Sequence, residues 1–423
     1  MSGAASGMAD RYLAVATALG DRLCRDALWD GPRCTWGGAA MEAADGEWTT
    51  IWRTAGPSLY EGTAGIALFL ARLGRATGAA RHLDAAGGAI AQALSRLDSV
   101  PPDAALGCYA GRLGIAFAAE TVGRLCGAEP LHDEAARLAA QIAQSDLSGH
   151  ESDVISGLAG AIPVLLALAR RWSDASLLAA ARRCGEALLG RALQHPRGWS
   201  WPASWDAGGP ALVGYSHGTA GIAVALLELH AATGDGRFRH AADRAHDYER
   251  HWYDPVRRNW PDLRFTGAAP GAEPSFPVFW CHGAAGIALA RLRAWAITGD
   301  PRLREEAETA IATTADTVDL LAAGAAGDAN FSLCHGLAGN ADVLLSAAVR
   351  LDDAEARRRA FLVGDVGLAR HGAAGVWPCG LPNGGETPGL LLGLAGIGYF
   401  YLRLHAASAV PSVLLIDSAD PAS

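Results

Sequence analysis

A short glycine signature, Gly-x-x-Gly, recurs seven times along this 423-residue chain and constrains its fold more than any other feature. Each copy is followed by a run of apolar residues at helical spacing. The first glycines of successive copies stand 46 to 65 residues apart, which leaves room for two helices and their loops. The copies are Gly62–Gly65, Gly111–Gly114, Gly157–Gly160, Gly218–Gly221, Gly283–Gly286, Gly336–Gly339 and Gly393–Gly396.

The segments between the signatures alternate in character. Runs such as Ile66–Leu70 and Ile222–Leu227 are apolar on nearly every side, which is typical of buried helices. Glu134–Ala143, Leu177–Leu189 and Leu303–Thr314 are amphipathic and suit a solvated outer layer. Seven such alternations predict an all-α fold, an (α/α) toroid in which seven inner helices are surrounded by seven outer ones.

We therefore expect one domain over residues 1–423, with the toroid over about residues 11–416 and short flexible termini. Glycine at the start of each inner helix would permit a positive φ and a close approach of neighbouring backbones. Strand signals are weak, except for a short hairpin expected within the Trp-rich stretch Gly198–Trp205.

Composition and charge argue against nucleic-acid binding, secretion and membrane insertion. The net charge of -9 and the lack of a basic stripe exclude nucleic acid as a partner, since such binding neutralises phosphates with clustered cations. The start, Met1–Asp10, has no apolar signal region, and no apolar stretch is long enough to span a bilayer. We expect a cytoplasmic protein. Every cationic residue is Arg, which favours a bacterial origin.

The residues just before each signature form a column that should face one central cavity, because all seven turns lie at the same end of a toroid. Two residues before the first glycines stand Tyr60, Tyr109, Ile155, Ser216, Cys281, Cys334 and Leu391. One residue before them stand Glu61, Ala110, Ser156, His217, His282, His335 and Leu392. Polar and metal-binding types gather in the fourth to sixth copies.

Cys281 and Cys334 occupy equivalent positions, 53 residues apart, so adjacent inner helices should hold two thiols side by side. Two cysteines and one histidine form a Zn²⁺ ligand set that leaves a position open for a substrate. Either His335 or His282 could be the third ligand, and the spacing does not choose between them.

These motifs resemble those of the lanthionine synthetase C-like cyclases over nearly the whole chain, from Arg11 to Ile416. The zinc pair of that family is matched by Trp280–Gly283 and Cys334–Gly336. Two further segments match at Asp153–Gly160 and Ser216–Gly221, and the C-terminal motifs at Pro388–Gly398 and Pro411–Leu415 resemble the cyclase half of two-domain class II synthetases. Some relatives carry an Arg shortly before the first zinc cysteine, and Ser275–Phe279 supplies none.

The resemblance implies a zinc-dependent cyclase that adds peptide cysteine thiols to dehydroalanine or dehydrobutyrine and so forms thioether rings. It assigns Zn²⁺ to Cys281, Cys334 and His335, and leaves His282 beside the metal or in catalysis. The implied substrate is a dehydrated precursor peptide. The chain begins almost at the first cyclase helix, so a separate dehydratase is the expected partner, and the chain could be a stand-alone cyclase or an excised domain.

The addition produces an enolate, which must be protonated at the α-carbon. His217 is our first candidate for that acid, with Asp153 orienting it and His282 as the alternative acid. His217 could instead take the proton of the incoming thiol. Tyr60, Tyr109, Tyr215 and Trp280 could line a peptide cavity or fill the core. The segments Trp199–Trp205 and Gly267–Pro277 would be loops over its mouth.

Other functions fit less well. A toroidal glycosidase would need two carboxylates at the cavity, and only Glu61 and Asp153 are suitably placed. A prenyltransferase subunit would be expected to use a carboxylate ligand and lacks the glycine signatures. A relative that adds glutathione to dehydroamino acids is disfavoured by the bacterial composition. A zinc-stabilised scaffold that only binds a peptide is the non-enzymatic alternative.

Overall fold

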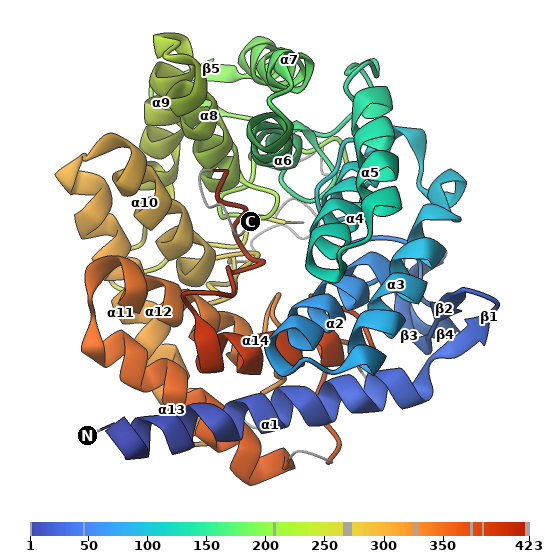
Figure 1. Ribbon diagram of the computed structural model, residues 1–423. Coiled ribbons are helices and arrows are strands. Elements are labelled where there is room, and N and C mark those ends of the chain that lie inside the picture. The colour runs from blue at the N-terminus through green and yellow to red at the C-terminus, as the bar shows by residue number, and fades with distance from the viewer. Residues whose placement is uncertain are drawn as a thin grey trace.

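The protein is seen in a computed structural model that describes residues 2–44, 47–205, 209–264, 273–324, 329–372, 375–382 and 385–418. Fourteen helices in this part of the chain form two concentric layers (Figure 1). The prediction of seven inner and seven outer helices is confirmed. Within the same residues, no helix is both long and apolar enough to cross a bilayer. The expected flexible C-terminal end falls on residues 419–423, outside the described residues.

Each inner helix begins one residue after the first glycine of a signature. The inner helices are α2 (Thr63–Thr77), α4 (Arg112–Cys126), α6 (Leu158–Trp172), α8 (Thr219–Thr233), α10 (Ala284–Thr298), α12 (Leu337–Leu351) and α14 (Leu394–Ala406). Consecutive inner helices contact one another, and α14 contacts α2, so the ring is closed. These helices are buried along almost their whole length, as their apolar sequences predict.

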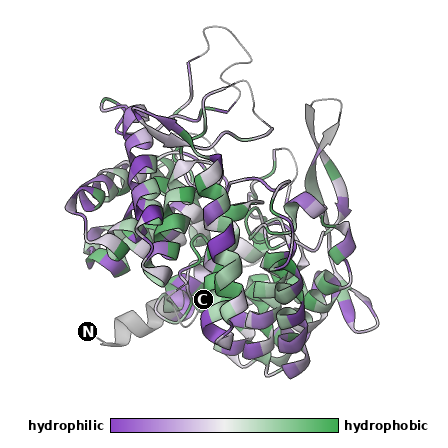
Figure 2. Ribbon diagram, turned by 90° about the horizontal axis from the view of Figure 1, so that it is seen from above, coloured by the Kyte–Doolittle hydropathy of each residue, from purple (hydrophilic) through white to green (hydrophobic). Residues whose placement is uncertain are grey.

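The outer helices each pack against the inner helix that precedes them in the chain. They are α3 (Ala80–Leu94), α5 (Glu129–Ile142), α7 (Ala175–Arg191), α9 (Gly236–Trp252), α11 (Pro301–Ala322) and α13 (Ala354–His371). The N-terminal helix α1 (Ser2–Asp26) covers α14 and completes the outer layer. Hydrophobic residues gather toward the interior, and hydrophilic ones lie on the outer helices (Figure 2).

The glycine signature works mainly through close approach. A Cβ on the second glycine of every copy would lie 1.6 to 2.2 Å from the carbonyl oxygen of the residue six positions earlier. The chain entering each turn therefore crosses directly over the first turn of the inner helix. The expected positive φ is wrong for six of the seven first glycines, whose φ lies between -100° and -136°. Only Gly283 has a positive φ, 85°.

The described part of the chain also forms three antiparallel hairpins outside the two helical layers. The pair β5 (Leu193–His195) and β6 (Gly198–Ser200) lies close to the expected hairpin, although it begins earlier in the chain. Two others were not predicted: β1 (Leu28–Asp30) with β2 (Arg33–Thr35), and β3 (Gly37–Ala44) with β4 (Glu47–Thr54). Strand β3 is composed largely of glycine and alanine, which have low strand propensity, so its sequence carries no clear strand signal.

Backbone hydrogen bonds join the seven turns into what we call the inner belt, made by the column residues two positions before each first glycine. In five links, the amide of one column residue donates to the carbonyl of the next around the ring. These are Tyr60 to Tyr109, Tyr109 to Ile155, Ser216 to Cys281, Cys334 to Leu391 and Leu391 to Tyr60, at 2.8 to 3.3 Å. The sixth link runs from Val154 N, one residue before Ile155, to Ser216 O.

The belt has one gap. Among the described residues, no backbone hydrogen bond joins Cys281 to Cys334, although every other neighbouring pair of turns is linked. The gap lies between α10 and α12, where the two thiols meet. The ring is therefore least tied together by its backbone at the place where the sequence predicts a metal.

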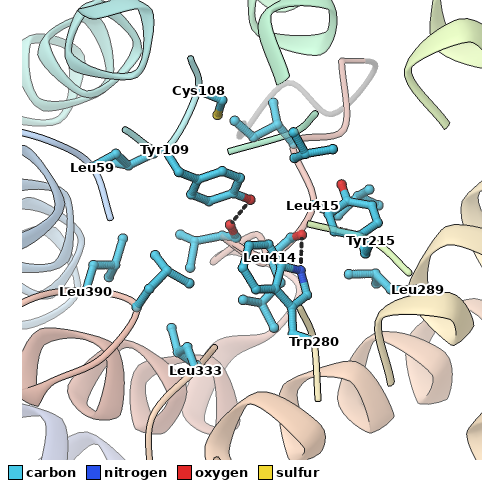
Figure 3. Packing of buried hydrophobic residues seen from close by; sticks show 14 of the residues in the cluster. Leu59, Cys108, Tyr109, Tyr215, Trp280, Leu289, Leu333, Leu390, Leu414 and Leu415 are labelled. Carbon is cyan, nitrogen blue, oxygen red and sulfur yellow. Dashed lines mark hydrogen bonds between the residues drawn. The ribbon is translucent and has the colours of Figure 1, made fainter. Parts of the chain in front are cut away.

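The segment Pro411–Ser418, which we call the C-terminal plug, runs into the centre of the ring (Figure 1). The Val413 carbonyl accepts a hydrogen bond from the Tyr109 hydroxyl at 2.8 Å, and the Leu414 carbonyl accepts one from Trp280 Nε1 at 2.9 Å (Figure 3). Asp417 anchors the plug through ion pairs to Arg293 and Arg350. The plug therefore contacts the belt from within the ring, at the column residue Tyr109 and at Trp280, which directly precedes the column residue Cys281.

Candidate metal centre

Cys281, Cys334 and His335 come together at the ends of the loops that lead into α10 and α12. The ligand atoms of the three residues all lie within 4.8 Å of one another. Equivalent positions in adjacent repeats place the two sulfurs side by side, as the 53-residue spacing predicts. His335 belongs to this group and His282 does not, so the geometry distinguishes between two histidines that the sequence left equal.

Hydrogen bonds orient the donor atoms. His335 Nε2 donates to the Gly380 carbonyl at 2.8 Å, which leaves Nδ1 free to bind a metal. The Tyr60 hydroxyl donates to Cys334 Sγ at 2.9 Å. The pKa of Cys334 lies well below its ordinary value, first because the Cys281 thiol donates to its sulfur and then because of bonds from His335 and Tyr60. This donor set favours a bound cation.

The chemistry of these donors fits Zn²⁺. Two thiolates and one neutral imidazole are soft and borderline ligands of the kind that zinc prefers, and three protein ligands leave a position for a substrate. The gap in the inner belt lies at the same place, so a metal held by Cys281 and Cys334 would join the two turns that the backbone leaves unlinked.

A cavity of about 530 Å³ opens beside the two sulfurs. Cys281, Cys334, Tyr60, Trp280 and His217 are among its lining residues. Of the four aromatic residues with two possible roles, Tyr60 and Trp280 line this cavity. Tyr109 and Tyr215 lie in the core, where Tyr109 packs against Trp280 at 5.3 Å between ring centroids (Figure 3).

Asp153 and His217 form a pair at the edge of this cavity. His217 Nδ1 lies 2.5 Å from Asp153 Oδ2, and the opposite carboxylate oxygen accepts from the Ser156 amide at 2.9 Å. Asp153 is buried, and its carboxylate is therefore fixed from both sides. The carboxylate holds the proton on Nδ1, so His217 presents Nε2 as its free nitrogen. The Trp205 ring packs edge-on against His217, with 5.5 Å between centroids.

His282 lies behind the cavity and is not among its lining residues. Its ring stacks near that of His217, with 6.1 Å between centroids, and its Nδ1 is 3.9 Å from Asp262. Burial, followed by the charge of Arg264, lowers the pKa of His282 to about 3. A neutral, buried imidazole in this place is a poor proton donor, but its role stays a prediction.

Arg264 was missed by sequence reasoning, which searched for a cation only directly before Cys281. Its guanidinium donates to Asp262 at 2.6 Å. Burial alone would lower the pKa of Arg264, but the bond to Asp262 and the negative charges of Cys281 and Cys334 raise it. The positive charge of Arg264 thus acts on the two thiolates from a different loop, and no local sequence motif predicts it. Of the expected mouth loop Gly267–Pro277, residues 267–272 lie outside the described residues.

The fold and the site together define a helical toroid with a candidate Cys₂His metal centre at one end of the ring. The chain belongs to the lanthionine synthetase C-like family, whose model matches residues 54–415. This finding bears out the resemblance drawn from the cysteine motifs.

One curated relative and two solved structures are similar to the chain. The chain is 26% identical over 196 residues to the Lacticin 481/lactococcin biosynthesis protein LcnDR2 of Lactococcus lactis subsp. lactis, an alignment that covers 46% of this chain and only 20% of that protein. Nisin cyclase superposes with a TM-score of 0.65 at 17% identity, covering 85% of this chain and 92% of its own.

A GH76 alpha-mannanase from Bacteroides thetaiotaomicron also superposes, with a TM-score of 0.51 at 11% identity over 93% of this chain and 95% of its own. At such identities, the likeness to both solved structures shows the fold alone. The toroid is therefore shared by proteins that catalyse different reactions, and the reaction of a given toroid is determined by the side chains at the end of its ring.

Proposed function

We propose that this protein is a zinc-dependent lanthipeptide cyclase that adds peptide cysteine thiols to dehydroalanine or dehydrobutyrine. The observation that carries the proposal is the meeting of Cys281, Cys334 and His335 beside a cavity that also exposes His217. The family placement and the likeness to a lacticin biosynthesis protein support it. The substrate would be a dehydrated precursor peptide, supplied by a separate dehydratase.

Cys281, Cys334 and His335 would hold the metal. A bound Zn²⁺ supplies a means of deprotonating a peptide thiol near neutral pH. The protein's remaining task is to handle one proton. The thiol loses it, the sulfur adds to the β-carbon of the dehydro residue, and the resulting enolate regains a proton at the α-carbon.

His217 would carry that proton. Its Nδ1 proton is held by Asp153, so Nε2 can accept the thiol proton and return it to the α-carbon. Asp153 stabilises the imidazolium formed between the two steps, and Ser156 fixes the carboxylate. Loss of a positioned acid–base group typically costs about 10²- to 10⁴-fold in rate.

Ring closure on a dehydrated, cysteine-containing precursor tests the proposal directly. Loss of free thiols would be followed by alkylation and mass spectrometry for wild type, His217→Phe and Cys334→Ala. We expect both variants to lose ring closure, and only Cys334→Ala to lose zinc. A wild-type protein that holds zinc but closes no ring on any dehydrated precursor would favour the scaffold role instead.

A further inference from the structure

The Tyr60 hydroxyl forms a hydrogen bond with only one of the two candidate metal-ligand sulfurs. It donates to Cys334 Sγ at 2.9 Å, whereas no hydroxyl bonds to Cys281 Sγ among the described side chains. Tyr60 also lines the cavity that contains both sulfurs and His217. It occupies, in the first repeat, the column position that Cys281 and Cys334 occupy in the fifth and sixth. The first repeat thus contributes a polar group to a centre built by two others.

The position of this hydroxyl is determined by the inner belt. The Tyr60 amide donates to Tyr109 O at 2.9 Å, and the Tyr60 carbonyl accepts from Leu391 N at 2.8 Å. Leu391 O in turn accepts from Cys334 N at 2.9 Å. Tyr60 and Cys334 are therefore connected twice, once through backbone links and once through their side chains. Such double support fixes the distance between the hydroxyl and the sulfur before any metal binds.

A hydrogen bond to a thiolate draws electron density from the sulfur and lowers its nucleophilicity. This matters here because a dehydroamino acid in the cavity is an electrophile that any exposed thiolate could attack. A productive reaction requires attack by the peptide sulfur, and attack by Cys334 would alkylate the protein and destroy the site.

We propose that Tyr60 is a positioning residue that holds Cys334 as a metal ligand and suppresses its addition to the electrophilic substrate. The inference rests on the proposed metal centre and adds a residue that no family motif assigns. Tyr60→Phe is the perturbation, because it removes one oxygen atom and keeps the ring. Tyr215→Phe is the matched control, since Tyr215 also lies at the ring centre and its hydroxyl is not a partner of the donor atoms.

The first measurement is the absorption spectrum of the full chain loaded with Co²⁺. Loss of the hydrogen bond raises the energy of the Cys334 lone pairs, so the sulfur-to-cobalt charge-transfer band of Tyr60→Phe should move to lower energy. The band of Tyr215→Phe should stay where it is in wild type. Equal metal content and equal melting temperatures for the three proteins would show that the change is local.

The second measurement is alkylation of the zinc-loaded proteins by N-ethylmaleimide, followed cysteine by cysteine with mass spectrometry. The sulfur forms a bond to one maleimide carbon, and water supplies a proton to the neighbouring carbon. Because hydrogen bonds to charged groups are among the stronger ones, we expect Cys334 to react about ten-fold faster in Tyr60→Phe than in wild type. Cys281 serves as the internal reference, whose rate should change little.

An unchanged charge-transfer band together with an unchanged Cys334 rate would overturn the role of Tyr60. Failure of the cyclase proposal would look different. In that case no precursor would be closed into a ring by the wild type, while the spectral shift and the faster alkylation of Cys334 in Tyr60→Phe would persist.

Discussion

Removal of the metal should open the ring at one place, between α10 and α12. Within the described residues, backbone hydrogen bonds link the inner belt at every junction except that of Cys281 with Cys334. If the metal supplies the missing link, its removal by a chelator leaves the two backbone hydrogen bonds next to the gap supported from one side only. These are the amides of Ser216 and Cys334, which donate to Cys281 O and Leu391 O.

The size of the effect follows from binding linkage. Free Zn²⁺ at 100 times its dissociation constant stabilises the folded state by about 2.7 kcal/mol. Unfolding entropy of roughly 2.1 cal/mol/K per residue amounts to about 0.9 kcal/mol/K for a chain of 423 residues. The melting temperature should therefore fall by about 3 °C on removal of zinc from that concentration.

Hydrogen exchange locates the effect within the ring. We expect peptides that contain Ser216 and Cys334 to lose the most protection when zinc is removed. Peptides around Tyr60 and Tyr109, on linked parts of the belt, should change least. Cys334→Ala, which lacks one donor, should show the same exchange with and without zinc. Equal loss of protection around all seven turns, or none at the flanking amides, would refute the idea that the metal closes the belt.

Further predictions concern packing and pH. Gly114→Ala should lower the free energy of unfolding by more than about 2 kcal/mol, because its Cβ would lie 1.6 Å from Cys108 O. Gly87→Ala should instead raise the free energy of unfolding by about 0.5–1 kcal/mol, because Gly87 lies within helix α3 and no atom lies within 4 Å of the added Cβ. Urea denaturation measures both changes. Leu414→Ala, at a fully buried position of the plug, should cost about 2–5 kcal/mol in the same assay. Burial, with nearby arginines, holds the pKa of His246 well below its usual value, so the unfolded chain binds a proton that the folded protein does not. Its contribution to stability is complete above about pH 6.5 and is lost progressively as the pH falls from there toward pH 5, a loss that His246→Phe should abolish. A Gly114→Ala protein as stable as wild type, or equal acid sensitivity of wild type and His246→Phe, would contradict these expectations.

The repeat explains why the architecture could be predicted from the sequence. Seven copies of one signature mark the starts of seven inner helices, and each helix begins one residue after its first glycine. The pairing of Cys281 with Cys334 follows from the same periodicity. The hairpin of β3 and β4 could not be predicted in this way, because β3 is rich in glycine and alanine and lacks alternation.

The parts of the site that escaped prediction depend on contacts between distant segments. Tyr60 reaches Cys334 across 274 positions of the chain. Arg264 approaches the sulfurs from a loop that is separate from the cysteine motif. Spacing alone did not choose between His335 and His282, because both directly follow a cysteine and precede a glycine. The family resemblance assigned the metal to His335, and the coordinates place His335 with the two sulfurs. Periodicity shows which backbone positions are equivalent, but it does not show where their side chains point.

The equivalence of the column positions has a consequence for how such a toroid acquires its chemistry. The links of the inner belt at Tyr60, Tyr109, Cys281 and Leu391 use backbone atoms, and at Ser216 the side-chain hydroxyl also donates to the Cys281 carbonyl. The backbone links themselves do not dictate which side chain stands at a column position. Aromatic, hydroxyl, thiol and aliphatic groups can occupy one structural position in different repeats. A mannanase can then share the toroid at 11% identity, because the fold supplies seven aligned positions and the sequence selects what they carry. In this chain the selection of two adjacent cysteines coincides with the only unlinked junction of the described belt, which ties the chemistry of the site to the closure of the ring.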